Sequence, residues 1–240
     1  MRALAIAAVG IVFCQAALGG LTVIFRLPTV VSVSHACLAQ IFFSITVVLA
    51  LVTSSTWKKP TVLLATEENA LLPLPALCVL VNIVFFLQLI AGALMRHTHS
   101  GLAIPDFPLA FGHLVPRVFT LPIAIHFAHR LGAILVVTLV TWLTIRIYTR
   151  QSHQLDLVAN AGALVGLVLF QLMLGAFIIW LRRPIPITTI HLIVGALSLA
   201  SSVALTAQVF RLAGWRPFSS WGLSATFTSV SDNTAVKGVT

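Results

Sequence analysis

QLMLGAFIIWLRRPIPITTIH, residues 171–191, joins the end of one apolar segment to the start of the next through a turn with two arginines and a proline. Residues 15–35, QAALGGLTVIFRLPTVVSVSH, have the same parts at the same spacing: a Gln-x-x-x-Gly, a basic turn with proline, and a histidine twenty positions after the glutamine. A third unit begins with QLIAG at 88–92 and continues through a longer loop to His126 and His129. This self-similarity predicts three copies of one helical hairpin, each with a histidine in the first turns of its second helix.

The composition excludes a soluble domain. Hydrophobic residues make up 59% of the 240 residues, charged residues make up 8%, and the mean hydropathy is +1.08. The apolar runs are continuous and long enough to cross a hydrocarbon core of about 30 Å, unlike the alternating strands of a membrane barrel. We therefore predict an all-α membrane protein with six transmembrane helices, near 3–25, 31–53, 74–95, 123–145, 157–181 and 187–210.

The lengths of the connections predict how the three repeated hairpins group. A short turn at about 146–156 joins the second hairpin to the third, whereas the longer segment 54–73 separates the first from the second. Short connections are typical of antiparallel neighbours in one bundle. The prediction is one complete four-helix bundle plus half of a second: an amino-terminal hairpin at 1–53, a cytoplasmic linker at 54–73, a carboxy-terminal four-helix bundle at 74–213 and a disordered tail at 214–240.

The net charge of +9 comes from basic residues scattered singly or in pairs at segment ends. Because they form no sustained stripe, they indicate membrane flanks and not a nucleic-acid partner. Eight basic residues fall on the side of the two termini and six on the opposite side. This bias predicts that both termini are cytoplasmic and that the loop 96–122 faces outward.

Three histidines occupy equivalent places in the repeat, a few residues inside the outer surface: His35, His129 and His191. Each alone could be an ordinary interfacial polar residue. Ionisable groups in membrane segments are costly and tend to face a bundle interior, however, and imidazole is a common axial ligand of haem iron. We predict that His129 faces His191 across the carboxy-terminal bundle as an axial pair, which leaves His35 without a partner.

Three arginines lie just outside these histidines: Arg130, Arg182 and Arg183. Charge-assisted hydrogen bonds from guanidinium groups would suit the carboxylates at the edge of a haem. The alternative is that these are ordinary arginines that extend from helix ends to the membrane interface.

The chain resembles the heme A synthase family of bacterial and mitochondrial inner membranes. The resemblance rests on RHTHSGLAIPDFPLAFGHLVP (96–116), HFAHR (126–130) and the two units 15–35 and 171–191, and it covers nearly the whole chain except the tail. It implies two similar four-helix bundles and an oxidoreductase that oxidises a methyl group of heme O during heme A biosynthesis.

The resemblance also implies the site and its partners. His129 and His191 match the axial pair of the carboxy-terminal bundle, and His35 matches one member of the amino-terminal pair. The cofactor implied is heme b, with heme O as substrate. The implied surroundings are the lipid bilayer of a bacterial plasma membrane or mitochondrial inner membrane, with heme O synthase, other cytochrome oxidase assembly factors or a further copy of the chain as partners.

The sequence departs from the family pattern at its amino-terminal end. The family's first helical hairpin, with its Glu-x-x-His-Arg, has no counterpart here, and the family's glutamate position corresponds to His126. The resemblance therefore supplies the haem pair but no catalytic residue.

Other interpretations remain open at the level of sequence. His97, His99 and His113 could join Asp106 and His126 in a metal cluster, although their spacing is loose. Asp106 is better suited to capping a turn in the Pro-Asp-Phe-Pro run, residues 105–108. Functional alternatives are a non-catalytic b-type cytochrome and a haem-handling assembly protein. A transporter is least favoured, because the six segments contain no broken helix and no intramembrane acid.

Overall fold

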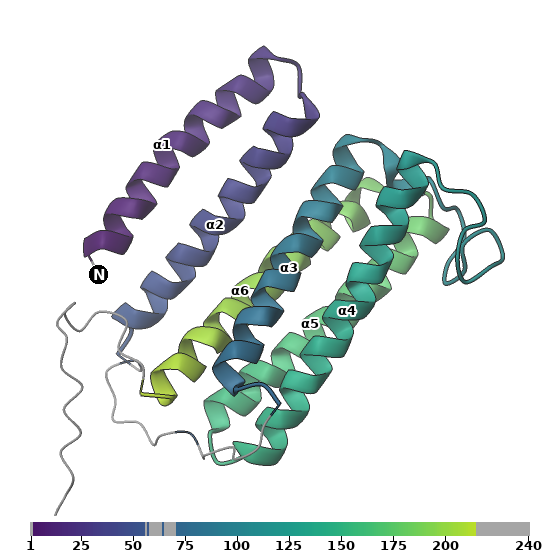
Figure 1. The fold of residues 1–240 in the computed structure, drawn as a ribbon. Helices are drawn as coiled ribbons and strands as arrows, with labels where there is room; N and C mark the ends of the chain where they lie inside the picture. The colour runs from purple at the N-terminus through teal and green to yellow at the C-terminus, as the bar shows by residue number, and fades with distance from the viewer. Residues whose placement is uncertain (1, 56, 58–63, 65–70, 215–240) are drawn as a thin grey trace, which may run out of the picture.

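The computed structural model describes residues 2–55, 57, 64 and 71–214. Most of the linker predicted at 54–73 and all of the disordered tail predicted at 214–240 except its first residue lie outside this part. Six helices in this part are long and apolar enough to cross a membrane, which confirms the predicted all-α fold. They follow one another as up-and-down neighbours (Figure 1): α1 (Arg2–Ile24), α2 (Thr29–Thr53), α3 (Leu74–His97), α4 (Leu121–Arg150), α5 (Leu155–Trp180) and α6 (Ile185–Leu212). A short 3-10 helix, η2 (Ser100–Leu102), opens the long loop between α3 and α4.

The first and third hairpins turn in the same way. Arg26 and Leu27 have φ angles of 55° and 62°, and Arg182 and Arg183 have φ angles of 57° and 64°. The amide of the second residue bonds back to the helix in both turns, from Leu27 to the Thr22 carbonyl and from Arg183 to the Ile178 carbonyl, each at 2.7 Å. These left-handed helix ends satisfy carbonyls that the helix leaves open, and a proline then begins the next helix. The repeat seen in the sequence is therefore also a repeat of backbone conformation.

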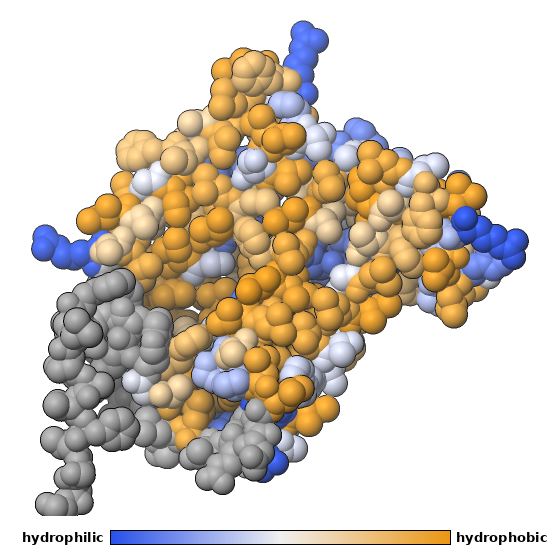
Figure 2. All heavy atoms as spheres, in the orientation of Figure 1, coloured by the Kyte–Doolittle hydropathy of each residue, from blue (hydrophilic) through white to orange (hydrophobic). Residues whose placement is uncertain are grey.

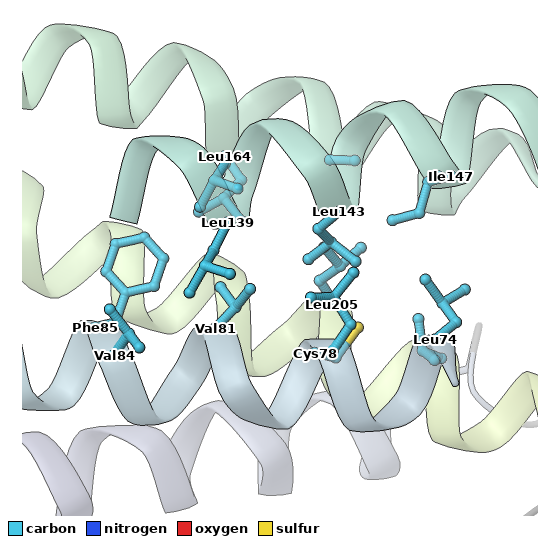
Figure 3. Packing of buried hydrophobic residues seen from close by; sticks show 14 of the residues in the cluster. Leu74, Cys78, Val81, Val84, Phe85, Leu139, Leu143, Ile147, Leu164 and Leu205 are labelled. Carbon is cyan, nitrogen blue, oxygen red and sulfur yellow. The ribbon is translucent and has the colours of Figure 1, made fainter. Parts of the chain in front are cut away.

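Helices α3 to α6 surround one apolar core (Figure 3). Side chains of α3, among them Val81 and Phe85, face Leu139 and Leu143 of α4, and Leu164 and Leu205 come in from α5 and α6. This cluster extends from the inner end of the bundle only as far as Phe85, Val136, Val168 and Leu199. The continuous core therefore stops before the outer ends of the helices.

The amino-terminal hairpin lies beside the four helices, with α2 against α3 and α6 and with α1 packed on α2 (Figure 1). A cavity of about 420 Å³ lies between part of this hairpin and α3 and α6. It is lined almost wholly by apolar side chains, including Ile41, Ile83 and Leu199. Much of the visible surface is apolar (Figure 2), as expected for helices that face lipid tails.

Candidate functional site

The glutamine of each repeat binds the backbone of the histidine in the same hairpin. Nε2 of Gln15, Gln88 and Gln171 donates to the carbonyl oxygen of His35, His129 and His191 at 3.1, 2.8 and 2.9 Å, respectively. The glutamine and the histidine that the sequence repeat identifies are therefore hydrogen-bonded to each other in all three hairpins. Each bond joins the two helices of a hairpin near their outer ends (Figure 1).

The glycine of each Gln-x-x-x-Gly makes room for the histidine ring. A Cβ atom built at Gly19 or Gly92 would lie 3.2 Å from Cε1 of His35 or His129, and one at Gly175 would lie 3.7 Å from Cε1 of His191. The small residue lets the imidazole lie directly on the neighbouring helix, so these glycines serve the histidines and not only the approach of two backbones.

The structure brings His129 and His191 together. They lie on α4 and α6 of the four-helix group, close enough for an electrostatic interaction between their rings. The Nδ1 atom of each is buried and has no hydrogen-bond partner among the described residues. His35 has the same local geometry but stands on α2, outside these four helices.

The loop between α3 and α4 is tied down by Arg130. Its Nε donates to Nε2 of His126 at 3.2 Å, and its terminal nitrogens donate to the carbonyl oxygens of Leu109, Asp106 and Ile104 at 2.7, 2.7 and 3.2 Å. Four of the five N–H groups of the guanidinium are thus used, and the group also lies over the Phe107 ring at 5.8 Å.

His126 is buried, at 3% exposure, and joins the same arrangement. Its Nδ1 lies 3.2 Å from the amide nitrogen of Ile104. A neutral imidazole accepts at only one ring nitrogen, so His126 can accept from Arg130 or from Ile104 but not from both at once. The bond from Ile104 ties the loop to α4 directly, whereas the bond from Arg130 fixes the guanidinium that holds the loop.

Asp106 holds a tight turn, but the turn is at 110–113 and not in the Pro-Asp-Phe-Pro run (105–108) where we predicted it. Its two carboxylate oxygens accept from the amides of Phe111 and Gly112 at 2.7 and 2.8 Å, and both of these residues have positive φ angles. The hydrogen bonds from Gly112 and Phe111 keep the pKa of the Asp106 carboxyl below its ordinary value, against the smaller opposing effect of desolvation.

The other two predicted arginines lie at the rim. Arg182 and Arg183 are exposed on the α5–α6 turn, and the Cδ of Arg183 would lie 3.6 Å from a Cβ at Gly101 in η2. Beside them Trp180 bonds the carbonyl of Phe107 at 3.4 Å and stacks edge to face on its ring, with centroids 6.0 Å apart. The loop therefore rests on the ends of both α4 and α5.

No group of three or more His, Cys, Asp or Glu side chains in the described part of the chain is arranged to hold a metal ion. In particular, Asp106 is engaged with its turn and His126 with Arg130 and the loop. What the arrangement offers instead is a pair of imidazoles.

A sequence profile described as "Cytochrome oxidase assembly protein" (COX15-CtaA) matches residues 1–203. The chain belongs to this family. Among its curated relatives are proteins named heme A synthase: that of Alkalihalophilus pseudofirmus is 31% identical over 133 residues, covering 55% of this chain and 45% of the relative. The protein of Shouchella clausii is 34% identical over 138 residues, covering 57% and 46%, respectively.

The cytochrome oxidase assembly family includes relatives longer than this chain. The chain spans about half the length of these two relatives. Membership and the six apolar helices together make the chain a multi-pass membrane protein that lies in a lipid bilayer.

Two side chains at the outer ends of α4 and α6, His129 and His191, are of the kind that binds haem iron. Two buried imidazole nitrogens without partners meet the ligand requirement of haem iron. The continuous apolar core ends at Val136 and Leu199, inward of both histidines. The outer end of the bundle is thus the part that the core cluster does not fill.

Two glycines contribute to this site that the sequence motifs did not indicate, Gly132 and Gly195. The side-chain oxygen of Gln88 lies directly over Gly132, and Nε2 of Gln171 lies 3.2 Å from the place where Gly195 would carry a Cβ. The available signal was a glycine three or four residues after His129 and His191. This glycine is one helical turn from the histidine and on the same face of the helix. The first hairpin has Ala39 at this position, so the glycine is not common to all three repeats.

Proposed function

We propose that the chain is a membrane oxidoreductase of the heme A synthase type, which oxidises a methyl group of heme O during heme A biosynthesis. The support is its family, the printed names of its relatives, and the histidine pair. Heme b would be the resident haem of the bundle formed by α3 to α6, and heme O would be the substrate.

One observation carries the proposal. His129 and His191 come from equivalent hairpins, lie near each other at the outer end of one bundle, and each has a buried ring nitrogen without a partner. His129 on α4 and His191 on α6 would hold the iron of a haem, which would supply one-electron chemistry when bound. His35 carries the same local setting and is our candidate for contact with the substrate haem.

The chain's other residues would hold the edge of the porphyrin and exclude water. Arg182 and Arg183 are exposed on the α5–α6 turn and are suited to donate to carboxylates at this end of the bundle. Arg130 already donates four N–H groups to the loop and His126. We therefore propose that the main role of Arg130 is to hold the α3–α4 loop over the outer end of the bundle. A contact with a haem carboxylate would be secondary.

Reduced-minus-oxidised absorption spectra of the purified protein test haem ligation. The wild type should show a low-spin haem, His129→Ala and His191→Ala should lose it, and His35→Ala should keep it. A wild type without haem, or variants that bind haem as the wild type does, would contradict the proposal.

A second candidate is a b-type cytochrome that does not modify porphyrin. It is favoured by the separate position of His35, which stands outside the four helices that carry the other two histidines. Haem extracted from cells that supply heme O and express the chain distinguishes the two. Heme A or a hydroxylated intermediate indicates the oxidoreductase, whereas unchanged heme O indicates the carrier or a haem-handling assembly protein. Co-purification would reveal partners such as heme O synthase or other cytochrome oxidase assembly factors.

A further inference from the structure

The side chain of Gln88 is held in one orientation. Its Nε2 donates to the His129 carbonyl at 2.8 Å and lies 3.5 Å from Nε2 of the same imidazole, while its oxygen lies over Gly132. A carbonyl oxygen cannot receive a hydrogen bond from another oxygen that carries no proton. The amide therefore cannot turn over, and its N–H groups must face the histidine.

Gln171 makes the same bond to the histidine backbone on the third hairpin, but it turns its nitrogen and not its oxygen towards the glycine of the next helix. Its Nε2 donates to the His191 carbonyl at 2.9 Å and lies close to Gly195. On the other side of each ring, one turn further along the neighbouring helix, are Gly92 and Gly175. Each imidazole thus lies on a glycine, and each histidine backbone is bonded to a glutamine, both contributed by the partner helix of the same hairpin.

We propose that Gln88 and Gln171 are positioning residues that set the orientation of the two axial imidazole rings. The proposal rests on the proposed haem ligation by His129 and His191. The bond to the backbone carbonyl fixes the height of each histidine against the neighbouring helix. On the second hairpin the Gln88 amide also lies beside the His129 ring and limits its rotation. Partners of metal ligands act in this way elsewhere, and losing one typically weakens metal binding by about tenfold or more.

Methionine substitutions test the role because methionine is close to glutamine in size but has no N–H donor. Gln88→Met and Gln171→Met should each weaken haem binding by about tenfold. They should also shift the electron paramagnetic resonance g-values of the ferric haem, which report the angle between the two imidazole planes. The matched control is Gln208→Met, because Gln208 also bonds across helices in the bundle, accepting from Nδ2 of Asn160 at 3.2 Å. This control should leave the g-values and haem affinity unchanged.

A second pair of variants keeps the glutamines intact. Gly132→Ala would displace the Gln88 amide, and Gly166→Ala is its control because a Cβ at Gly166 meets nothing within 4 Å. Gly132→Ala should move the g-values in the same direction as Gln88→Met, and Gly166→Ala should leave them as they are.

The outcomes separate this inference from the proposed function. If the wild type binds haem through His129 and His191, and Gln88→Met and Gly132→Ala show wild-type g-values and affinity, the positioning role is wrong and the haem site stands. If the wild type binds no haem, both proposals fail. If the Gln88→Met protein does not fold, Gly132→Ala takes its place. A shift of the g-values in Gly132→Ala, at a wild-type melting temperature, then supports the inference.

Discussion

Arg130 shows how much one side chain contributes to the outer end of this protein. Its guanidinium joins three carbonyls of the loop to α4 and also reaches His126, one turn earlier on the same helix. Because the acceptors in the loop are backbone carbonyls, which every residue has, no sequence motif could have predicted these contacts. The arginine was identifiable from its sequence position, but its main bonds were not.

Replacing Arg130 by lysine should loosen the loop while keeping the charge. Lysine is a single point donor and cannot reproduce a planar fork that reaches several acceptors. Losing such bonds typically costs about 1–3 kcal/mol, so we expect chymotrypsin to cut near the exposed Phe111 and Phe119 about tenfold faster. Arg117→Lys, on an exposed part of the same loop, is the control. Equal cleavage rates for the two variants would contradict the assignment.

Asp106 gives the same loop a dependence on pH. Its carboxylate is stabilised by the amides of Gly112 and Phe111, so its pKa is lower in the folded loop than in an unfolded chain. The contribution to stability is full above the unfolded value of about 3.9 and is lost as the pH falls through the folded pKa. In lipid nanodiscs, proteolysis of the loop should accelerate in this acid range, and Asp106→Asn should show rapid cleavage already at pH 7. A wild type and variant with the same pH profile would refute this role.

The helical hairpin is the element that recurs, and its turn is the part under strain. Arg26 and Leu27 in the first turn and Arg182 and Arg183 in the third have left-handed conformations without being glycine. Such a conformation costs roughly 1–2 kcal/mol per residue for an L-amino acid. The proline that follows and the bonds back to the preceding helix hold the chain in this shape.

Leu27→Gly should therefore stabilise the first hairpin by about 1 kcal/mol, after allowing for the greater freedom of glycine in the unfolded chain. Leu27 is 63% exposed, so little packing is lost. Thermal unfolding in detergent should show a higher midpoint for Leu27→Gly than for wild type, whereas Leu27→Ala should give no gain. A lower midpoint for the glycine variant would show that the turn is not strained.

The number and approximate positions of the six transmembrane helices were predictable from hydropathy, but the residues at which they begin and end were not. The run predicted at 123–145 is Leu121–Arg150 in the structure, and 187–210 is Ile185–Leu212. A hydropathy pattern marks only the part of a helix that crosses lipid, whereas the backbone hydrogen bonds continue into polar residues such as Arg146 and Arg150. Pro122 and Pro186, near the starts of these helices, also mark beginnings that an apolar window does not detect.

At the scale of the whole molecule, the histidine hairpins share one direction. Because the helices alternate up and down (Figure 1), the α1–α2 turn, the long loop and the α5–α6 turn lie at one end, and the α4–α5 turn at the other. We expect the first end to face outward and both termini to be cytoplasmic, in line with the distribution of basic residues.

Cysteine labelling tests this orientation. In a background without Cys14, Cys37 and Cys78, a membrane-impermeant maleimide added to intact cells should modify His113→Cys in the long loop and spare His153→Cys in the α4–α5 turn. Both should react after the membrane is opened. Labelling of His153→Cys in intact cells would reverse the topology.

The grouping of helices was only partly accessible from the sequence. The repeat indicated which histidines are equivalent, and the short connection indicated that the second and third hairpins are neighbours. The docking of α2 on α3 and α6, and the cavity between them, depend on side-chain shape across surfaces with almost no polar pattern. Apolar helices in lipid carry little information about which neighbour they choose.

The three glutamine–histidine bonds all lie inside a hairpin, and none joins one hairpin to another. This has a consequence for biogenesis. A hairpin leaving the insertion machinery already carries its histidine at the final height, before any other hairpin arrives. On the proposed ligation by His129 and His191, docking two such preformed halves also brings the two ligands together, so we expect haem to be loaded at the last step of assembly.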